Sequence, residues 1–340
     1  MATTVEVLSE AFDEMGTPFI VGHPGGETVE LMDAARNRQV RFILMKQETA
    51  GAMMAATWGE ITGSPGVSVS TRGPGAANMV NGVAHAWMDR APLIVINDQY
   101  PGATYETGMR QVLNQHALFA PITKWQSTIH AKSVRQQIRR AIRVTTTPTP
   151  GPVQFDMPSN ETMGEAVEAA GEAPLLPNFV PMEPDRNALR VPLQALSNAS
   201  RPILLAGLGV FWDAASAELV KLAERLGAPV LTTSKSKGAI PEDHPLRAGC
   251  IIGGIIEREL VMQADLIVTV GLDAIELQPK PWPYAIPVIS LANTPTLEAL
   301  VPAQSEMIGN LKTMLAALAE FAPEGSGWGE SAAKNFREQV

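Results

Sequence analysis

The chain has 340 residues, too many for one domain of average size, so two domains are expected. Hydrophobic residues make up 45% of the sequence and charged residues 18%, which favours large buried cores and excludes a disordered or coiled-coil protein. The 26 basic and 35 acidic side chains give a net charge of −9, and no Lys/Arg cluster provides the basic face that a nucleic-acid binder needs.

Cysteine content and hydropathy indicate the compartment. Cys250 is the one cysteine, so the chain has no internal disulfide or Cys-based zinc site, which fits a reducing compartment. The N-terminal sequence MATTVEVLSEAF is typical of an amphipathic helix and has no basic segment leading into an apolar one. No apolar run approaches the roughly 18–20 residues that span a bilayer. We therefore expect a soluble, cytoplasmic protein without a membrane segment.

Short apolar segments alternate with helical patterns through the first half of the chain. Each apolar segment is rich in β-branched residues and apolar on both faces, as in a parallel sheet covered by helices on both sides. The expected strands are residues 18–22, 40–45, 66–70, 92–97 and 152–157. The expected helices are residues 3–15, 27–38, 49–62, 76–89 and 131–146. This order predicts a doubly wound α/β domain with a mainly parallel sheet over residues 1–160.

The pattern breaks after residue 160. Residues 161–185 are rich in Ala, Glu and Pro and lack sustained periodicity, which predicts an interdomain linker. A second α/β domain is expected over residues 186–325, and the polar residues 326–340 are interpreted as a connecting tail or a frayed end. The elements expected in it are strands 202–206, 229–232, 265–270 and 286–291 and helices 214–227, 253–263 and 305–321.

Two of the expected strands end in residues suited to a ligand site. The turn Gly22-His23-Pro24-Gly25-Gly26 follows the first strand, and glycine-rich turns at the carboxyl ends of parallel strands let the backbone approach a ligand closely. Glu48 follows the second strand and begins a helix of small residues, so a desolvated carboxylate there is a candidate for proton transfer. The alternative is an ordinary acidic residue in a first helical turn, and spacing alone favours that alternative.

Glycine-rich turns also follow two later strands. The segment Thr71-Arg72-Gly73-Pro74-Gly75-Ala76-Ala77-Asn78 makes a rigid turn before a helix and lacks the Gly-Lys-Ser/Thr ending of a P-loop. Gly207-Leu208-Gly209 begins like a dinucleotide fingerprint, but Trp212 stands at the position of its third glycine, so a nicotinamide oxidoreductase is only a minor alternative. The five histidines have no metal-binding spacing, and no metal site is predicted.

The order of the motifs resembles one known family. Gly-x-Pro-Gly-Gly, Glu48, Gly-Pro-Gly-Ala-x-Asn, Asp89-x-x-Pro92-Leu93 and Gly151-Pro152-Val153-x-x-Asp156-x-Pro158 follow one another in the first half. Arg201-Pro202-Ile203, Gly207-x-Gly209 and Ala264-Asp265-Leu266 continue the series in the second half. Together they resemble the N-terminal pyrimidine-binding domain and the central domain of the thiamine-diphosphate-dependent enzyme superfamily, which includes acetolactate synthases and benzoylformate decarboxylases.

The resemblance implies roles for individual residues. Glu48 would hydrogen-bond N1′ of the aminopyrimidine of thiamine diphosphate and favour the tautomer whose 4′-nitrogen takes the thiazolium C2 proton. The other implied cofactor-binding residues are Pro24, Gly25, Gly26, Gly73, Gly75 and Asn78. The implied substrate residues are His23, Gln111, His116 and Lys124.

The substrate class that the resemblance implies is a 2-keto acid, on which the protein would act as a decarboxylase (a lyase) or a carboligase (a transferase). The sequence departs from acetolactate synthases at His23, where they commonly have Tyr, and at Val112 and Asn114, where they have acidic residues. Lys124-Trp125 is closer to the decarboxylases of aryl keto acids. The individual keto acid is therefore not predicted.

The sequence lacks one motif of the family. Relatives hold the diphosphate through Mg²⁺ with a Gly-Asp-Gly…Asn stretch in a third domain, and this chain contains no Gly-Asp-Gly. The resemblance then implies half of a cofactor site, weak thiamine diphosphate binding without a partner chain, and residues 326–340 leading toward the missing domain. A fragment of a longer enzyme, one subunit of a split enzyme and a non-catalytic regulatory or binding paralogue all stay open.

Two further properties follow from the expected domains. The helices that carry Glu48 and residues 76–89 are rich in small and apolar residues, which predicts a homodimer through the pyrimidine-binding domain. Some synthases hold FAD in the central domain, and the sequence does not decide whether this chain does.

Overall fold

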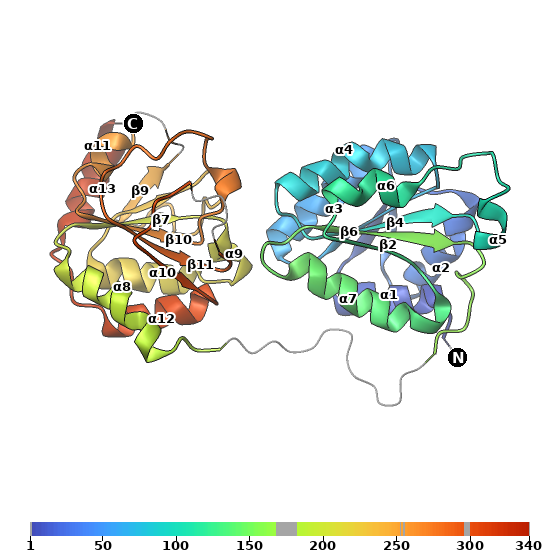
Figure 1. Cartoon of the computed structure of the whole chain (residues 1–340), viewed down its shortest axis with the longest axis horizontal. Helices are drawn as coiled ribbons and strands as arrows, with labels where there is room; N and C mark the ends of the chain where they lie inside the picture. The colour runs from blue at the N-terminus through green and yellow to red at the C-terminus, as the bar shows by residue number, and fades with distance from the viewer. Residues whose placement is uncertain (1, 168–181, 252, 254–255, 296–299, 340) are drawn as a thin grey trace. The chain divides into compact units, whose positions relative to one another are not determined.

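The computed structural model describes residues 2–167, 182–251, 253, 256–295 and 300–339. The chain divides into two compact units, Met1–Asn178 and Phe179–Val340 (Figure 1). In the described residues each unit contains a six-stranded sheet whose strand pairs are all parallel, with helices on both faces. This confirms the predicted α/β class.

The first unit has the strand order β2-β1-β3-β4-β6-β5. The strands are β1 (Phe19–His23), β2 (Arg41–Leu44), β3 (Gly66–Ser70), β4 (Leu93–Gln99), β5 (Trp125–Thr128) and β6 (Pro152–Pro158). The α-helices are α1 (Thr4–Glu14), α2 (Val29–Asn37), α3 (Glu48–Thr62), α4 (Pro74–Met88), α5 (Gly102–Tyr105), α6 (Gln115–Phe119) and α7 (Val134–Thr146). Short 3₁₀ turns are η1 (Gly26–Thr28), η2 (Ala120–Ile122) and η3 (Ala131–Ser133).

Two hydrophobic layers enclose this sheet. Helices α1 and α7 pack on one face, and α3, α4 and α6 pack on the other (Figure 1). Every residue of β3, β4 and β6 is buried, as expected for strands covered on both faces. At the start of the chain, Thr3 and Glu6 form a capping box that satisfies the first backbone donors of α1.

Small residues let α3 lie close to the sheet and to α4. A Cβ added at Gly66 would lie 1.9 Å from the carbonyl oxygen of Ala55, and one at Gly82 would lie 2.6 Å from Cβ of Ala52. Larger side chains at these positions would force the helix outward. The close packing fixes the N-terminus of α3, where Glu48 lies, at the carboxyl edge of the sheet.

The second unit has the strand order β12-β11-β10-β7-β8-β9. The strands are β7 (Pro202–Ala206), β8 (Val230–Thr232), β9 (Arg247–Cys250), β10 (Leu266–Val270), β11 (Val288–Ala292) and β12 (Ser305–Ile308). The helices are α8 (Arg186–Asn198), α9 (Gly209–Trp212), α10 (Ser216–Leu226), α11 (Arg258–Val261), α12 (Leu311–Phe321), α13 (Trp328–Gln339) and the 3₁₀ turn η4 (Ala274–Glu276). Helices α8, α10 and α12 contribute to one hydrophobic layer, and α11 and α13 to the other.

The structure corrects two expectations at the C-terminal end. The helix expected over 305–321 is strand β12 followed by α12, because residues 305–308 pair with β11 and Asn310 caps the helix by accepting the Thr313 N–H at 3.2 Å. The expected frayed tail is helix α13, which packs on β9 and buries Ala333 and Phe336. Its apolar residues are spaced at the helical period within a polar sequence, and composition alone concealed that pattern.

Other expected segments are met only in part. Strands β5 and β9 and helix α8 were not expected. Of the helix expected over 253–263, residues 254–255 lie outside the described part, and the described residues form the single helical turn α11. Of the expected linker, residues 168–181 lie outside the described part, while residues 162–166 hydrogen-bond to the start of α1 and belong to the first unit. No helix formed by the described residues combines the length and apolar character that crossing a membrane requires.

Candidate functional site

The topology of the first sheet marks one position at its carboxyl edge. Strand β2 lies on one side of β1 and the strands from β3 onward lie on the other, so the strand order reverses between β1 and β3. Ligands of open α/β sheets bind outside the carboxyl ends of the strands at such a switch point. Helix α3 reaches this position after β2, and the turn that starts α4 reaches it after β3.

Glu48 and Asn78 meet at the switch point. Glu48 is 8% exposed, and its Oε2 accepts a hydrogen bond from Nδ2 of Asn78. The backbone carbonyl of Asn78 in turn accepts a hydrogen bond from the Thr49 hydroxyl. These contacts join α3 and α4 near their N-termini and fix the orientation of the carboxylate.

Gly75 determines how much space surrounds Oε1, the other carboxylate oxygen of Glu48. A Cβ added at Gly75 would lie 3.3 Å from Oε1 of Glu48 and 2.8 Å from Cγ2 of Thr71. Any larger residue would crowd that oxygen. The structure therefore brings together Glu48, Gly75 and Asn78, three of the residues that the sequence singled out.

The turn after β1 lies at the same edge. Nδ1 of His23 is 2.8 Å from the carbonyl oxygen of Met45, so Nδ1 carries the proton of a neutral ring and Nε2 is left as the acceptor. The backbone N–H and the hydroxyl of Thr28 donate to the carbonyl of Gly25 at 3.3 Å and 3.0 Å, which closes the turn. Pro24, Gly25 and Gly26 thus lie at the tip of β1, the strand that borders the switch point.

Gly73 links this region to the loop before α6. Its φ is +63°, a left-handed value that favours glycine, and a Cβ there would lie 2.3 Å from the carbonyl oxygen of Gln111. The N–H of Gly73 donates to Oε1 of Gln115 at 2.9 Å. Gln111 therefore contacts Gly73 through its backbone, while its own side chain is exposed.

A buried polar network extends from Gln115 across the ends of β4 and β6. Nε2 of Gln115 donates to Oδ1 of Asp156 at 2.6 Å, and Nε2 of Gln154 donates to the same oxygen at 2.8 Å. Nε2 of His116 lies 3.5 Å from Oδ2 of Asp156. His116 and Asp156 also line a hollow of about 410 Å³ together with Tyr105.

Sequence reasoning missed part of this network. One missed residue is Gln115, which is 1% exposed. Another is Arg72, whose guanidinium lies 2.7 Å from Asp98 Oδ2 and stacks on Tyr100 at 3.9 Å from the ring centroid. The available signal was the run Asn-Asp-Gln at the end of an apolar strand, since polar residues in a fully covered strand need partners. Among the described residues no three His, Cys, Asp or Glu side chains converge into a metal-binding group.

Lys124 lies apart from the other predicted residues. It precedes β5 at the amino edge of the sheet, and its Nζ donates to the carbonyls of Thr147 and Thr149, both at 2.7 Å. Burial, and secondarily the charge of Arg90, lowers the pKa of Lys124 to about 8. The contacts stabilise the turn before β6, and the structure does not place Lys124 with His116 or Glu48.

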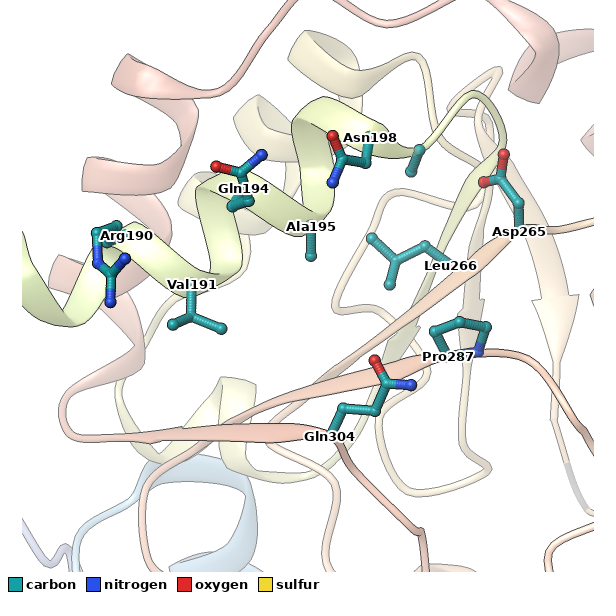
Figure 2. Close-up of a pocket in the computed structure, with 10 residues that line it drawn as sticks. Arg190, Val191, Gln194, Ala195, Asn198, Asp265, Leu266, Pro287 and Gln304 are labelled. Atoms are coloured by element: carbon teal, nitrogen blue, oxygen red, sulfur yellow. The ribbon is translucent and has the colours of Figure 1, made fainter.

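The second unit has a hollow at the corresponding amino edge of its own sheet. Figure 2 shows residues of α8, among them Val191 and Gln194, on one side, and Leu266 and Gln304 from the strand ends on the other. Its volume is about 420 Å³. The carboxylate of Asp265 at the rim of this hollow already accepts hydrogen bonds from the backbone N–H groups of residues 200 and 201, each at 2.8 Å. The amino edge is not where ligands of such sheets bind, so this hollow is not the favoured site.

Comparisons with known proteins find family models and curated relatives that match both units. Residues 2–118 match the family model "Thiamine pyrophosphate enzyme, N-terminal TPP binding domain", and residues 190–318 match "Thiamine pyrophosphate enzyme, central domain". The chain is 33% identical over 273 residues to a probable acetolactate synthase large subunit from Methanocaldococcus jannaschii, covering 78% of this chain and 46% of that protein. It is 31% identical over 280 residues to a probable 2-ketoarginine decarboxylase from Pseudomonas aeruginosa, covering 80% and 49%.

Solved structures share the fold. A thiamine diphosphate-dependent 4-hydroxybenzoylformate decarboxylase from Rhodococcus jostii superposes with a TM-score of 0.82 at 24% identity, covering 96% of this chain and 63% of that one. A benzoylformate decarboxylase from Polynucleobacter necessarius gives 0.81 at 19% identity, with 96% and 62% covered. The chain spans about half the length of the curated relatives that it matches.

Proposed function

The chain belongs to the thiamine pyrophosphate enzyme family, and on that premise we propose that it forms the pyrimidine-binding and central parts of an enzyme that decarboxylates or ligates a 2-keto acid. The observation that carries the proposal is the buried carboxylate of Glu48 at the switch point of the first sheet. The names of the relatives support the substrate class, since they include both a synthase and a keto-acid decarboxylase.

The residues at the switch point fit an aminopyrimidine ring. When bound, thiamine diphosphate supplies a carbon nucleophile and an electron sink for the keto acid. Through its Oε1, Glu48 would hold a proton at the ring nitrogen N1′, while Asn78 fixes Oε2. Gly75 leaves space beside Oε1, and the low exposure of Glu48 keeps competing water away from the proton.

We place the keto acid toward the hollow lined by His116. Its Nε2 and the nearby Asp156 carboxylate form a pair that can pass a proton to or from a substrate oxygen. The 410 Å³ volume suits a small organic acid. His23 and Gln111 border the same carboxyl edge of the sheet and are proposed as further substrate contacts.

The diphosphate end of the cofactor is proposed to bind outside these 340 residues, in a C-terminal continuation or in a separate chain that also holds the metal. The sequence has no Gly-Asp-Gly, and the chain covers about half of its relatives. A non-catalytic regulatory or binding paralogue is the alternative function, and it shares the same fold and pyrimidine pocket.

A homodimer through α3 and α4 is proposed on the basis of apolar exposure. Met54 and Ile61 on α3 are 36% and 79% exposed, and Met88 at the end of α4 is 61% exposed. Their helices already pack against each other and the sheet, so this outer apolar surface is suited to a second copy. Light scattering of the wild type and of Ile61→Glu tests it: a dimer that the variant weakens supports the proposal, and a wild-type monomer at micromolar concentration contradicts it.

The catalytic proposal is tested on Glu48→Gln with Glu30→Gln, an exposed glutamate of α2, as the matched control. Each protein is mixed with a chain that carries a diphosphate-binding domain, Mg²⁺ and thiamine diphosphate, and both cofactor binding by calorimetry and CO₂ release from 2-keto acids are measured. We expect Glu48→Gln to lose roughly 10²–10⁴-fold in turnover and the control to lose none. Near-normal turnover of Glu48→Gln would overturn the role of Glu48, and cofactor binding without turnover in the wild type would favour the paralogue.

A further inference from the structure

The sheet of the second unit has a switch point of its own. Strands β8 and β9 lie on one side of β7, and β10 to β12 lie on the other, so the order reverses between β7 and β10. In dinucleotide-binding α/β units the glycine turn after the first strand presents backbone N–H groups to the pyrophosphate at this position. Here that turn is Gly207-Leu208-Gly209.

The three N–H groups of this turn are all bonded within the chain. Gly207 N donates to Val270 O at 2.8 Å, and Gly209 N donates to Gly271 O at 2.8 Å. The N–H of Leu208 lies 2.9 Å from both carboxylate oxygens of Glu276. A pyrophosphate at this turn would have to displace these acceptors.

Glu276 is held in place by several donors. Its Oε2 accepts the N–H of Asp273 at 2.9 Å, and its Oε1 accepts the hydroxyl of Thr233. Burial raises the pKa of Glu276, while the hydrogen bonds from Asp273, Thr233 and Leu208 act in the opposite direction. The carboxyl group thus accepts the Leu208 N–H, one of the donors that a phosphate at this turn would use.

The glycines are explained by the chain's own packing. A Cβ at Gly207 would lie 2.6 Å from Oε2 of Glu276 and 2.5 Å from Cα of Leu272, and one at Gly209 would lie 2.8 Å from Cα of Gly271. The turns after β7 and β10 are therefore in direct contact. Close approach of these two strand ends requires glycine whether or not a ligand binds.

A second carboxylate, that of Asp213, fills the neighbouring part of the carboxyl edge of this sheet. Oδ2 of Asp213 accepts Nδ2 of Asn293 and the N–H of Leu311, both at 2.6 Å. Nδ2 of Asn293 also lies 3.3 Å from the carbonyl of Gly209. This group ties the start of α12 to the glycine turn, so the crevice is filled on the β11 side as well.

We infer that the central unit fills its own dinucleotide position: the Glu276 carboxylate takes the place of a pyrophosphate at the switch point, and the unit binds neither FAD nor a nicotinamide dinucleotide there. The residues present do not fit the flavin that some acetolactate synthases hold in this domain. The dinucleotide-like glycines serve the contact between β7 and β10.

Ligand titration of the full chain is the first test. The purified protein is expected to show no flavin absorbance, and FAD, NAD and ADP are expected to give no saturable binding and no change in hydrogen exchange of the Leu208 amide. Stoichiometric flavin, or a dinucleotide that protects the Leu208 amide, would overturn the inference.

Variants of Glu276 give an independent test. Glu276→Ala is expected to speed hydrogen exchange at the Leu208 and Asp273 amides at least tenfold, and millimolar acetate is expected to restore protection by replacing the carboxylate. Glu259→Ala, which removes an exposed glutamate of α11, is the matched control and should leave both amides unchanged. If Glu276→Ala does not fold, Glu276→Gln replaces it, because glutamine keeps the shape of the glutamate side chain. Glu276→Gln is expected to lose less protection from hydrogen exchange at the Leu208 and Asp273 amides. Unchanged exchange in a folded Glu276 variant would show that the carboxylate does not hold the turn.

Discussion

Replacing Gln115 by Leu is expected to destabilise the first unit, because this one side chain connects three parts of the candidate site. Its Oε1 accepts the Gly73 N–H at 2.9 Å, and its Nε2 donates to the Asp98 carbonyl at 3.2 Å and to Asp156 Oδ1 at 2.6 Å. Each hydrogen bond contributes about 0.5–1.5 kcal/mol net, and a buried donor without a partner costs about 1–3 kcal/mol. Asp156 keeps its bond from Gln154, so the unpaired group is mainly the Gly73 N–H. We expect a loss of about 2–4 kcal/mol.

The assay has to report on the first unit alone, because the chain has two compact units and one melting temperature would mix them. Hydrogen exchange read on peptides covering β3 and β4 gives the opening free energy of this sheet directly. Gln136→Leu, on the exposed face of α7, is the matched control and should change stability by no more than about 0.5 kcal/mol. A loss below about 0.5 kcal/mol for Gln115→Leu would refute the reasoning that the network is both buried and connected.

Two further predictions concern Gly75 and Lys124. Gly75→Ala is made in a Thr71→Ser background, because Thr71→Ser removes the Cγ2 atom that would lie 2.8 Å from the new Cβ. The new Cβ then lies 3.3 Å from Glu48 Oε1, so the affinity for the cofactor, measured by calorimetry, should fall while the stability of the protein stays the same or rises. Unchanged affinity would mean that Oε1 does not face the ring of the cofactor. The pKa of Lys124 is lowered from 10.5 to about 8, so between these pH values the unfolded chain binds more protons than the folded one and stability rises with pH. The free energy of unfolding of the wild type relative to Lys124→Met should therefore increase from pH 8 to pH 10.5, and a constant difference would show that Lys124 titrates normally.

The sequence predicted the sheets well where strands are apolar on both faces. Strand β3 was expected over the residues that form it, and β4 and β6 were expected to within two residues at each end. Strands β5, β9 and β12 were missed because they are short and mostly half-buried, so their sequences carry no continuous apolar run. What identified them in the structure is parallel pairing with a neighbouring strand, which is a long-range property that local sequence does not encode.

The same limit applies to the site. Glu48, Gly75 and Asn78 could be singled out because each follows an apolar strand within a glycine-rich or helix-starting pattern, and parallel strands bring such ends together. Lys124 could not be placed, since the order of motifs along the chain does not say at which edge of the sheet a residue lies. Gln115 was missed because its partners lie up to 42 residues away, and a lone glutamine in a short helix carries no signal of burial.

The sheets of the two units differ in strand order, but each has a switch point, and the two switch points are used in opposite ways. The difference comes from the contacts that the acidic side chain beside each glycine turn makes. At the β1/β3 switch point the glycines lie beside Glu48, whose Oε1 faces Gly75 rather than a backbone donor. At the β7/β10 switch point the Leu208 N–H of the turn donates directly to Glu276, so neither this N–H nor the carboxylate is available to a ligand. A carboxylate whose two oxygens already accept an N–H of the turn is unavailable to a ligand, whereas one anchored through a single oxygen keeps the other for chemistry. On this argument the same glycine-rich signature predicts a ligand only where the nearby acidic side chain is not its acceptor.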